Sequence, residues 1–300
     1  MVTTMNVGIS PVLNDASFSP FDPSVPVQRS TFLMCKPTLY EVSYVINPWM
    51  AGNIHTSSRS KAKEQWKDLY SNISQIAEVS LIDPKPGLPD MVFTANAGLE
   101  RNGVTVLSNF FHKERQGEEQ YFRQWFQNRG YDVVTLPREI SFEGEGDALF
   151  SEDGTTLWAG YGQRTMKSSH RYLSNTWNVE VVSLYLQDSR FYHLDTCFAP
   201  LTGGFVMYYP PAFDSPSLRK IEDRFAKEKR ILVDEPDAMQ FACNVINVGN
   251  AVVLNEISKN LSSQLAERAF YVVQVPLGEF IKAGGAAKCL VMKLSKSIPD

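Results

Sequence analysis

The sequence contains few cysteines, and none of them are paired as CxxC. The four, Cys35, Cys197, Cys243 and Cys289, are widely scattered. This spacing argues against a disulfide scaffold or a thiolate zinc site and favours a reducing compartment. No apolar run approaches the ~20 residues of a membrane span. The first residues also lack the basic-then-apolar order of a signal peptide. We therefore expect a cytoplasmic protein that does not contact a membrane.

The chain also lacks an excess of one charge. It has 29 basic and 33 acidic residues, which gives a formal net charge of -4. No cationic block is present that would collect phosphates, so we expect no nucleic-acid partner and instead expect a small-molecule substrate. With 43% hydrophobic residues in 300, the chain can bury a sizeable core.

Residues 1–30 are rich in Pro, Ser and Asn and show neither strand nor helix periodicity, so they predict a flexible leader. Residues 31–300 are then expected to form a single domain. An apolar strand, a turn, a second strand, a helix and a third strand recur along this part. The predicted first strands are 91–93, 147–150, a segment starting at His193, 242–246 and 289–294, the last pairing with 31–34.

One such unit cannot cover both faces of its small sheet, so several must pack together, and joining the last unit to the first removes open edges. The pattern predicts an α/β fold closed into a ring, and an ordinary open α/β sheet is the alternative. Equivalent positions around a ring converge on its axis. Polar or reactive residues fall at or near successive first strands: Asn96, Glu143 with Asp147, His193, Asn244 and Cys289.

Cys289 follows the small-residue loop KAGGAAK, which lets a ligand approach the backbone. Loop flexibility and the adjacent Lys288 would favour a thiolate nucleophile. The alternative is an inert apolar filler, the interpretation we give to the other three cysteines. Strand alternation would put His193 and Asp195 on one face, as a general acid and its partner require. A buried structural histidine is the alternative there.

The stretch FEGEGD (142–147) places three carboxylates among glycines, which would let them point inward at a compact cation. It lacks the ligand spacing of an EF-hand, and a solvated acidic turn is the other interpretation. A guanidinium is planar, permanently charged and matched by carboxylates. Carboxylates, a thiol and an imidazole on one axis therefore suggest a substrate like arginine, attacked at its guanidino carbon.

Several motifs, in order along the chain, resemble the guanidino-group-modifying enzymes of the pentein fold, and among them the cyanobacterial-type arginine dihydrolases. They are PDMVFTANAGL, HKERQGEE, FEGEGDAL, WAGYGQRT, FYHLDTCFAPL, FACN and GGAAKC, and the resemblance covers about residues 31–296. It implies a pentein-type β/α propeller with pseudo-fivefold symmetry of strand-strand-helix-strand units. It also implies one catalytic domain over 31–300 that needs no metal or organic cofactor.

The resemblance also implies roles for individual residues. Cys289 would be the nucleophile, His193 the general acid and base, and Glu143 and Asp195 the guanidinium ligands. The remaining implied substrate contacts are Arg115 and Arg164 for the substrate carboxylate, Asn47 in a lid region, and Asp90 and Asn244 within their motifs.

Asn96 stands where the deiminases of this superfamily carry an aspartate. An aspartate repels the oxygen of a neutral ureido group, whereas an asparagine can donate an N–H to it. The resemblance therefore implies a dihydrolase, which converts L-arginine through bound citrulline to L-ornithine, two ammonia and carbon dioxide. A deiminase that stops at citrulline, an amidinotransferase and a non-catalytic ribosome-binding ring are the alternatives. A homo-oligomer, and fusion to a C-terminal ornithine-processing domain in a longer native chain, stay open.

Overall fold

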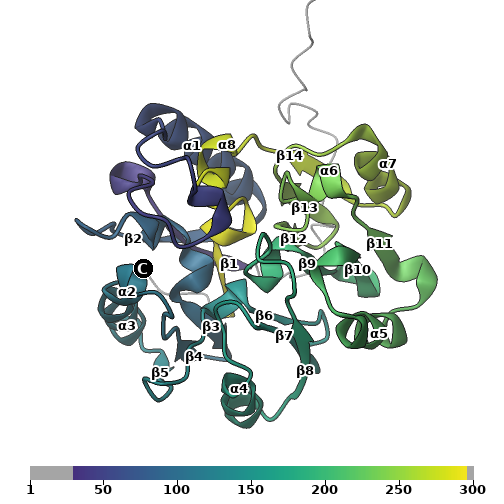
Figure 1. Cartoon of the computed structure of the whole chain (residues 1–300), viewed down its shortest axis with the longest axis horizontal. Coiled ribbons are helices and arrows are strands. Elements are labelled where there is room, and N and C mark those ends of the chain that lie inside the picture. Colours follow the sequence, from purple (N-terminus) through teal and green to yellow (C-terminus); the bar gives the residue numbers. More distant parts are fainter. Residues whose placement is uncertain (1–29, 296–300) are drawn as a thin grey trace, which may run out of the picture.

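The computed structural model describes residues 30–295, which form five three-stranded sheets set around a central axis (Figure 1). Residues 1–29 of the predicted leader lie outside the described residues. The first strand, β1, starts at Thr31, where the sequence predicts the domain to begin. The ring predicted from the repeat is confirmed.

All five sheets share one topology. The first strand of a unit runs antiparallel to the middle strand, and the third strand runs parallel to it. The strands are β1 (Thr31–Cys35), β2 (Glu78–Ile82), β3 (Gly98–Arg101), β4 (Val104–Leu107), β5 (Asp132–Val134), β6 (Ala148–Phe150), β7 (Thr156–Tyr161), β8 (Glu180–Tyr185), β9 (Phe198–Leu201), β10 (Phe205–Tyr208), β11 (Arg230–Leu232), β12 (Ile246–Val248), β13 (Ala251–Leu254), β14 (Tyr271–Gln274) and β15 (Met292–Leu294).

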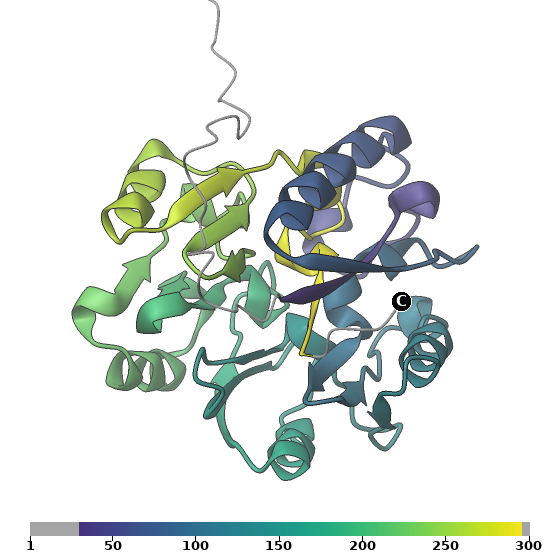
Figure 2. The same ribbon diagram turned by 180° about the vertical axis from the view of Figure 1, so that it is seen from behind.

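A helix connects the two parallel strands of each unit, as a parallel crossover requires. These helices lie on the periphery of the ring in both views (Figures 1 and 2). They are α1 (Arg59–Ile76), α3 (Glu119–Gln127), α4 (Ser169–Trp177), α5 (Ser215–Arg224) and α7 (Lys259–Glu267). Three shorter helices are α2 (Lys113–Gln116), α6 (Glu235–Ala238) and α8 (Gly278–Ile281).

Helix α1 illustrates why these segments are helical. Its N-cap Ser58 accepts a hydrogen bond from the backbone N–H of Lys61, which satisfies one of the free amides of the first turn. Its buried residues are Ala62, Trp66, Leu69 and Ile73. They recur every three or four positions, so one stripe of the helix faces the sheets.

The two ends of the described chain close the ring. Strand β15 pairs antiparallel with β1, and Thr31 lies opposite Leu294 while Leu33 lies opposite Met292. The last unit is therefore assembled from both ends of the domain, as predicted. An open sheet, the alternative from the pattern alone, would have left this edge unpaired.

The predicted positions of four first strands are wrong. The run 91–93 lies in two consecutive 3-10 turns, Pro89–Val92 and Thr94–Ala97, and the strand starts at Gly98. Likewise Leu194–Thr196 and Lys288–Leu290 are 3-10 turns that precede β9 and β15. The predicted strand 242–246 is mostly a turn before β12.

Burial explains these errors. Residues 91–100 are all buried, on the turns as well as on the strand. Hydrophobicity alone does not separate a short buried strand from another buried segment. This difference affects the site, because Asn96, Asp195 and Cys289 lie on 3-10 turns that precede first strands.

Within residues 30–295, no helix combines the length and apolarity needed to cross a membrane.

His170, on α4, is expected to make the fold sensitive to acid. Its ring nitrogens contact the Ser183 hydroxyl at 2.7 Å and the Gly160 carbonyl at 3.3 Å, so the neutral ring is satisfied. Burial lowers the pKa of His170 to about 4. Between that pH and the ordinary value near 6.5, the unfolded chain binds a proton that the folded chain does not, so stability falls as pH falls through this window.

The loss attributable to His170 should reach about 3 kcal/mol near pH 4. Urea unfolding of the parent and of His170→Gln, each at neutral pH and at about pH 4.5, measures it. The substituted protein should lose less stability on acidification, whereas the same change at exposed His55 should leave the parent's loss intact. Equal losses in the parent and in His170→Gln would contradict the expectation.

Candidate active site

A small enclosed cavity lies where the axial turns meet. It is lined by seven of the ten predicted site residues: Asn47, Asp90, Asn96, Arg115, Arg164, His193 and Cys289. Its volume is about 10 Å³, room for about one water molecule. The thiol and the imidazole, nearly a hundred positions apart in sequence, thus border the same space. Any larger ligand requires the lining side chains to move.

Asn244 holds Cys289 in place. Its Oδ1 accepts the backbone N–H of Cys289 at 3.0 Å and that of Ala286 at 3.2 Å, and its Nδ2 lies 3.1 Å from the Cys289 Sγ. All of these contacts go to the cysteine loop. Asn244 is therefore placed to position the thiol, and the predicted direct contact with substrate stays a prediction.

The two glycines before Cys289 are needed because the loop is tightly packed. A Cβ at Gly285 would lie 2.6 Å from the Phe93 ring and 3.1 Å from the Cys289 Cβ. Gly284 has a φ of +84°, and a Cβ there would lie 2.6 Å from the Tyr192 hydroxyl. Close approach, rather than flexibility alone, is what these glycines provide.

The expectation that the loop favours a thiolate is wrong for this structure. Burial, and then the negative charge of Asp195, raise the pKa of the Cys289 thiol well above its ordinary value. The adjacent Lys288 ammonium does not contact the sulfur but pairs with Glu145 at 2.6 Å. Both effects favour the protonated thiol, and a positive charge beside the sulfur would oppose them.

The Asp195 carboxylate contacts the Cys289 thiol. Its Oδ2 lies 3.4 Å from the Cys289 Sγ, and its buried Oδ1 has no hydrogen-bond partner among the described residues. Burial raises the pKa of Asp195 to about 7, with Lys288 opposing. The predicted strand alternation with His193 is wrong, since Leu194–Thr196 is a 3-10 turn. The turn directs His193 to Glu143 and Asp195 to the thiol.

His193 is held by a carboxylate. Its Nε2 lies 2.8 Å from the Glu143 Oε2, and the same oxygen accepts from the Arg164 Nη1 at 3.1 Å. Burial raises the pKa of Glu143, but the positive charges of Arg164 and His193 outweigh it and hold that pKa below its ordinary value. Glu143 is therefore ionised and able to orient the imidazole. A second carboxylate, that of Asp147, lies 3.9 Å from the same ring nitrogen.

The two predicted carboxylate-binding arginines are already paired within the protein. Besides Glu143, Arg164 donates to the Ile46 carbonyl at 2.8 Å and stacks over the Tyr192 ring. Arg115 donates to the Asn96 Oδ1 at 2.8 Å. Both arginines are almost fully buried. A substrate carboxylate would have to share these guanidinium groups with their present partners.

Asp90 and Asn47 complete the cavity wall. The Asp90 Oδ2 accepts from the Tyr44 hydroxyl at 2.9 Å, while its buried Oδ1 has no partner among the described residues. Asn47 caps the 3-10 turn Pro48–Met50 and donates to the Ala283 carbonyl at 3.0 Å. Asp90 thus offers an open acceptor, and Asn47 ties the segment over the cavity to the cysteine loop.

Sequence reasoning missed two buried contributors. Tyr192 supports Arg164 and donates to the Gly284 carbonyl at 2.6 Å. Glu118 binds Arg115 through both oxygens, at 2.9 and 2.8 Å. Both residues lie inside quoted motifs, FYHLDTCFAPL and HKERQGEE. Membership in these motifs could have indicated that the two residues belong to the site. Their contact partners could not be predicted, because those depend on the conformation of the axial turns.

Gly146 is a further position without room for a side chain. A Cβ there would lie 2.3 Å from the Asn96 Nδ2 and 3.3 Å from the His193 ring. Gly146→Ala should therefore displace both groups and lower turnover by roughly tenfold or more, as small displacements of reacting groups do.

The control for Gly146 is Gly278→Ala, because a Cβ at Gly278 meets nothing within 4 Å. It should leave turnover near the parent value in the same steady-state assay. Full turnover by Gly146→Ala in a protein that melts like the parent would show that the close contact is not needed.

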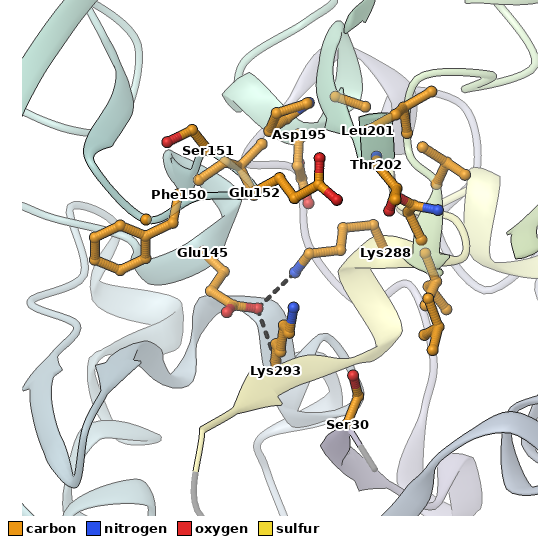
Figure 3. Close-up of a pocket in the computed structure, with 18 of the residues that line it drawn as sticks. Ser30, Glu145, Phe150, Ser151, Glu152, Asp195, Leu201, Thr202, Lys288 and Lys293 are labelled. Carbon is orange, nitrogen blue, oxygen red and sulfur yellow. Dashed lines mark hydrogen bonds and ion pairs between the residues drawn. The ribbon is translucent and has the colours of Figure 1, made fainter. Parts of the chain in front are cut away.

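A second, larger basin has a volume of about 440 Å³ (Figure 3). It is bordered by residues that follow the first strands, such as Asn102 after β3 and Thr202 after β9. Figure 3 shows the Lys288 to Glu145 ion pair within it. The basin reaches Asp195 but neither Cys289 nor His193. The two predicted reactive groups, Cys289 and His193, border the small cavity instead.

No group of His, Cys, Asp and Glu side chains suited to a metal ion occurs within residues 30–295. Fold and site together define a pentein-type enzyme of the class that modifies guanidino groups, with a thiol, an imidazole and carboxylates on its axis. A family model described as "N,N dimethylarginine dimethylhydrolase, eukaryotic" matches residues 47–296. The chain belongs to the dimethylarginine dimethylaminohydrolase family.

Individual relatives refine this assignment. The bifunctional arginine dihydrolase/ornithine cyclodeaminase ArgZ of Synechocystis sp. is 56% identical over 89% of this chain. The N(G),N(G)-dimethylarginine dimethylaminohydrolase of Mycobacterium tuberculosis is 36% identical over 88% of this chain and 85% of its own length. This chain spans only 38% of the length of ArgZ.

A solved structure has the same fold. The crystal structure of the N-terminal domain of ArgZ, as a cysteine-to-serine mutant bound to substrate, matches with a TM-score of 0.87 at 56% identity. The match covers 88% of this chain and 97% of that one. The similarity therefore extends through the whole of that domain.

Proposed function

We propose that this chain is an arginine dihydrolase, which hydrolyses L-arginine to L-ornithine, two ammonia and carbon dioxide. The observation that carries the proposal is the single cavity bordered by the Cys289 thiol, the His193 imidazole and the Asn96 amide. The identity to ArgZ supports it.

Binding of the substrate guanidinium activates the thiol, which releases its proton to solvent as the thiolate forms. A cation beside Cys289 and Asp195 lowers the pKa that burial has raised. Asp195 Oδ1 and Asp90 Oδ1, both buried without partners among the described residues, can accept guanidinium N–H groups. Unpaired buried acceptors cost free energy until a donor arrives, so the site favours a ligand rich in N–H groups.

The first half-reaction forms a C–S bond between Cys289 and the guanidino carbon. The C–N bond to a terminal nitrogen then breaks, and protonated His193 supplies the proton with which ammonia leaves. A cysteine-linked thiouronium remains. Glu143, 2.8 Å from the imidazole, keeps the ring oriented.

The second half-reaction uses water. His193, now neutral, takes a proton from a water molecule, whose oxygen adds to the thiouronium carbon. The C–S bond breaks and the sulfur leaves as thiolate. The product, citrulline, still occupies the cavity. A second round at its ureido carbon releases another ammonia and leaves a thiocarbamate on Cys289. Its hydrolysis gives a carbamic acid, which breaks down to ornithine and carbon dioxide.

Asn96 distinguishes this reaction from one that stops at citrulline. Its Nδ2 donates to the Glu143 carbonyl at 3.0 Å and carries a second N–H. That N–H can bind the ureido oxygen, which the cationic substrate lacks. Leaving such an oxygen unpaired costs about 1–3 kcal/mol.

We further propose that residues 31–300 act as one catalytic domain in the cytoplasm. The length of ArgZ supports an additional C-terminal domain in a longer native chain, one that would act on ornithine. A homo-oligomer is compatible with the proposal and is not required by it.

Incubation with isotope-labelled L-arginine tests the function. We expect ornithine, ammonia and carbon dioxide in the stated ratio, with at most transient citrulline. Persistent citrulline would instead identify a deiminase, and transfer of the labelled carbon to an added amine would identify an amidinotransferase. Because the family model is described as a dimethylarginine hydrolase, N,N-dimethylarginine belongs in the same assay. Dimethylamine release faster than ornithine formation would overturn the proposal.

A further inference from the structure

We propose that Glu118, acting through Arg115, fixes the orientation of the Asn96 amide and so makes the site competent for citrulline. The inference rests on the proposed function and deepens it. Glu118 is a positioning residue here, because it does not border the cavity. It is a fully buried carboxylate for which the proposed mechanism has no other use.

Glu118 and Arg115 form a rigid pair. The Arg115 Nε donates to one Glu118 oxygen at 2.9 Å, and the Nη2 donates to the other at 2.8 Å. The Nη2 also donates to the Asp90 carbonyl at 3.1 Å, and the guanidinium stacks over the Phe110 ring. Such a two-point contact fixes the plane of a guanidinium as well as its position. The Nη1 group is thereby aimed at Asn96.

Asn96 is held from both ends of its amide. The Oδ1 accepts from the Arg115 Nη1 at 2.8 Å, and the Nδ2 donates to the Glu143 carbonyl at 3.0 Å. If the Asn96 amide were flipped, its NH2 group would face the Arg115 Nη1 donor and its oxygen would face the Glu143 carbonyl oxygen. Both hydrogen bonds would be lost, and like groups would be opposed. The orientation therefore follows from chemistry that only one flip state satisfies.

This orientation matters differently for the two substrates. Arginine presents only N–H donors at its reacting end, so it makes no hydrogen bond with the free Nδ2 hydrogen and does not depend on it. Citrulline presents an oxygen and needs the free Nδ2 hydrogen. Without Glu118, Arg115 can turn, and the amide can sample the flipped state that shows its oxygen to the cavity. Citrulline hydrolysis should then suffer more than arginine hydrolysis.

Arg115 also keeps capacity for a second task. A guanidinium has five N–H donors, and the contacts above use four of them. The remaining hydrogen, on Nη1, can meet the substrate carboxylate. Substitution of Arg115 would thus mix two effects, which makes Glu118 the better test position.

The test uses Glu118→Gln, which keeps the shape but turns an NH2 group against the Arg115 donors. Initial rates are measured on one preparation with L-arginine and, separately, with L-citrulline supplied as substrate. The ratio of the two kcat/KM values does not depend on the folded fraction. We expect this ratio to fall by about tenfold or more, with citrulline accumulating from arginine.

Two comparisons sharpen the test. Glu100→Gln removes another buried carboxylate, one that binds the backbone of Gly103 and Ser295, and should leave the ratio near the parent value. In an Asn96→Ala background, Glu118→Gln should change the ratio no further, because coupled residues are not additive. A full additional loss there would overturn the inference.

The outcomes separate the two proposals. If the parent protein leaves citrulline untouched, the dihydrolase function fails, and this inference fails with it. If the parent consumes citrulline and Glu118→Gln has an unchanged ratio, or loses both activities equally, only the role of Glu118 is refuted.

Discussion

Asn96→Asp should consume arginine but release citrulline. The new carboxylate can still accept from Arg115, which now donates to the Asn96 Oδ1 at 2.8 Å. It cannot donate to the Glu143 carbonyl or to a ureido oxygen, and it would repel that oxygen. We expect citrulline hydrolysis to fall by roughly 10- to 100-fold or more, with arginine hydrolysis retained. Chromatographic quantification of citrulline and ornithine over time measures both rates.

Asn72→Asp, which adds the same charge on the outer helix α1, serves as the control and should form ornithine like the parent. Ornithine formation by Asn96→Asp at the parent's rate would show that the amide is not what permits the second hydrolysis. Loss of both reactions in a protein that melts normally would also count against this role.

Cys289→Ser should abolish turnover of both arginine and citrulline, by roughly a thousandfold or more, as loss of a nucleophile does. A serine hydroxyl is far less acidic than a thiol, and the positive charge of the substrate would not suffice to ionise it. The protein should still bind arginine, since the carboxylates and arginines of the cavity remain. Steady-state rates and calorimetric titration with arginine separate the two properties.

Cys243→Ser is the matched control. Cys243 is also buried, and burial raises the pKa of its thiol as well, but it does not border the catalytic cavity. This variant should keep most of its activity. Alkylation of Cys289 should be slowed by arginine. Labelling that arginine does not affect, together with no turnover by the parent protein, would favour a non-catalytic ring.

The repeating architecture could be predicted from the sequence because it depends on local pattern. Strand-forming runs such as 104–107 and 251–254, and helices capped by residues such as Ser58 and Ser258, require only short-range information. The pairing of β15 with β1 followed from the need to bury the edge of a split unit. The repeated strand-helix pattern and the pairing of the two chain ends were together enough to predict the propeller fold.

The axial turns could not be predicted in the same way. Residues 91–97 and 289–290 are buried as completely as strands, and hydrophobicity was the only signal available. Their 3-10 conformation comes from packing against neighbouring units. As a result, the expected alternation of His193 with Asp195 was wrong, although both residues reach the site.

The charge state of the site likewise depends on tertiary contacts. Lys288 is next to Cys289 in sequence, yet its ammonium binds Glu145 and does not contact the sulfur. Arg115 and Arg164 looked like free anion contacts, but they pair with Glu118 and Glu143. Sequence neighbours do not determine which charges meet across the axis.

By itself the sequence determined the five-unit ring, the family and the chemical groups gathered at the axis, because periodicity and residue type are local properties. Only the tertiary structure decided which way the Asn96 amide faces, which carboxylate holds His193 and how acidic Cys289 is. Those properties arise where five separate segments pack within a few ångströms of one another. At that range, burial and charge pairing outweigh any preference encoded in neighbouring residues.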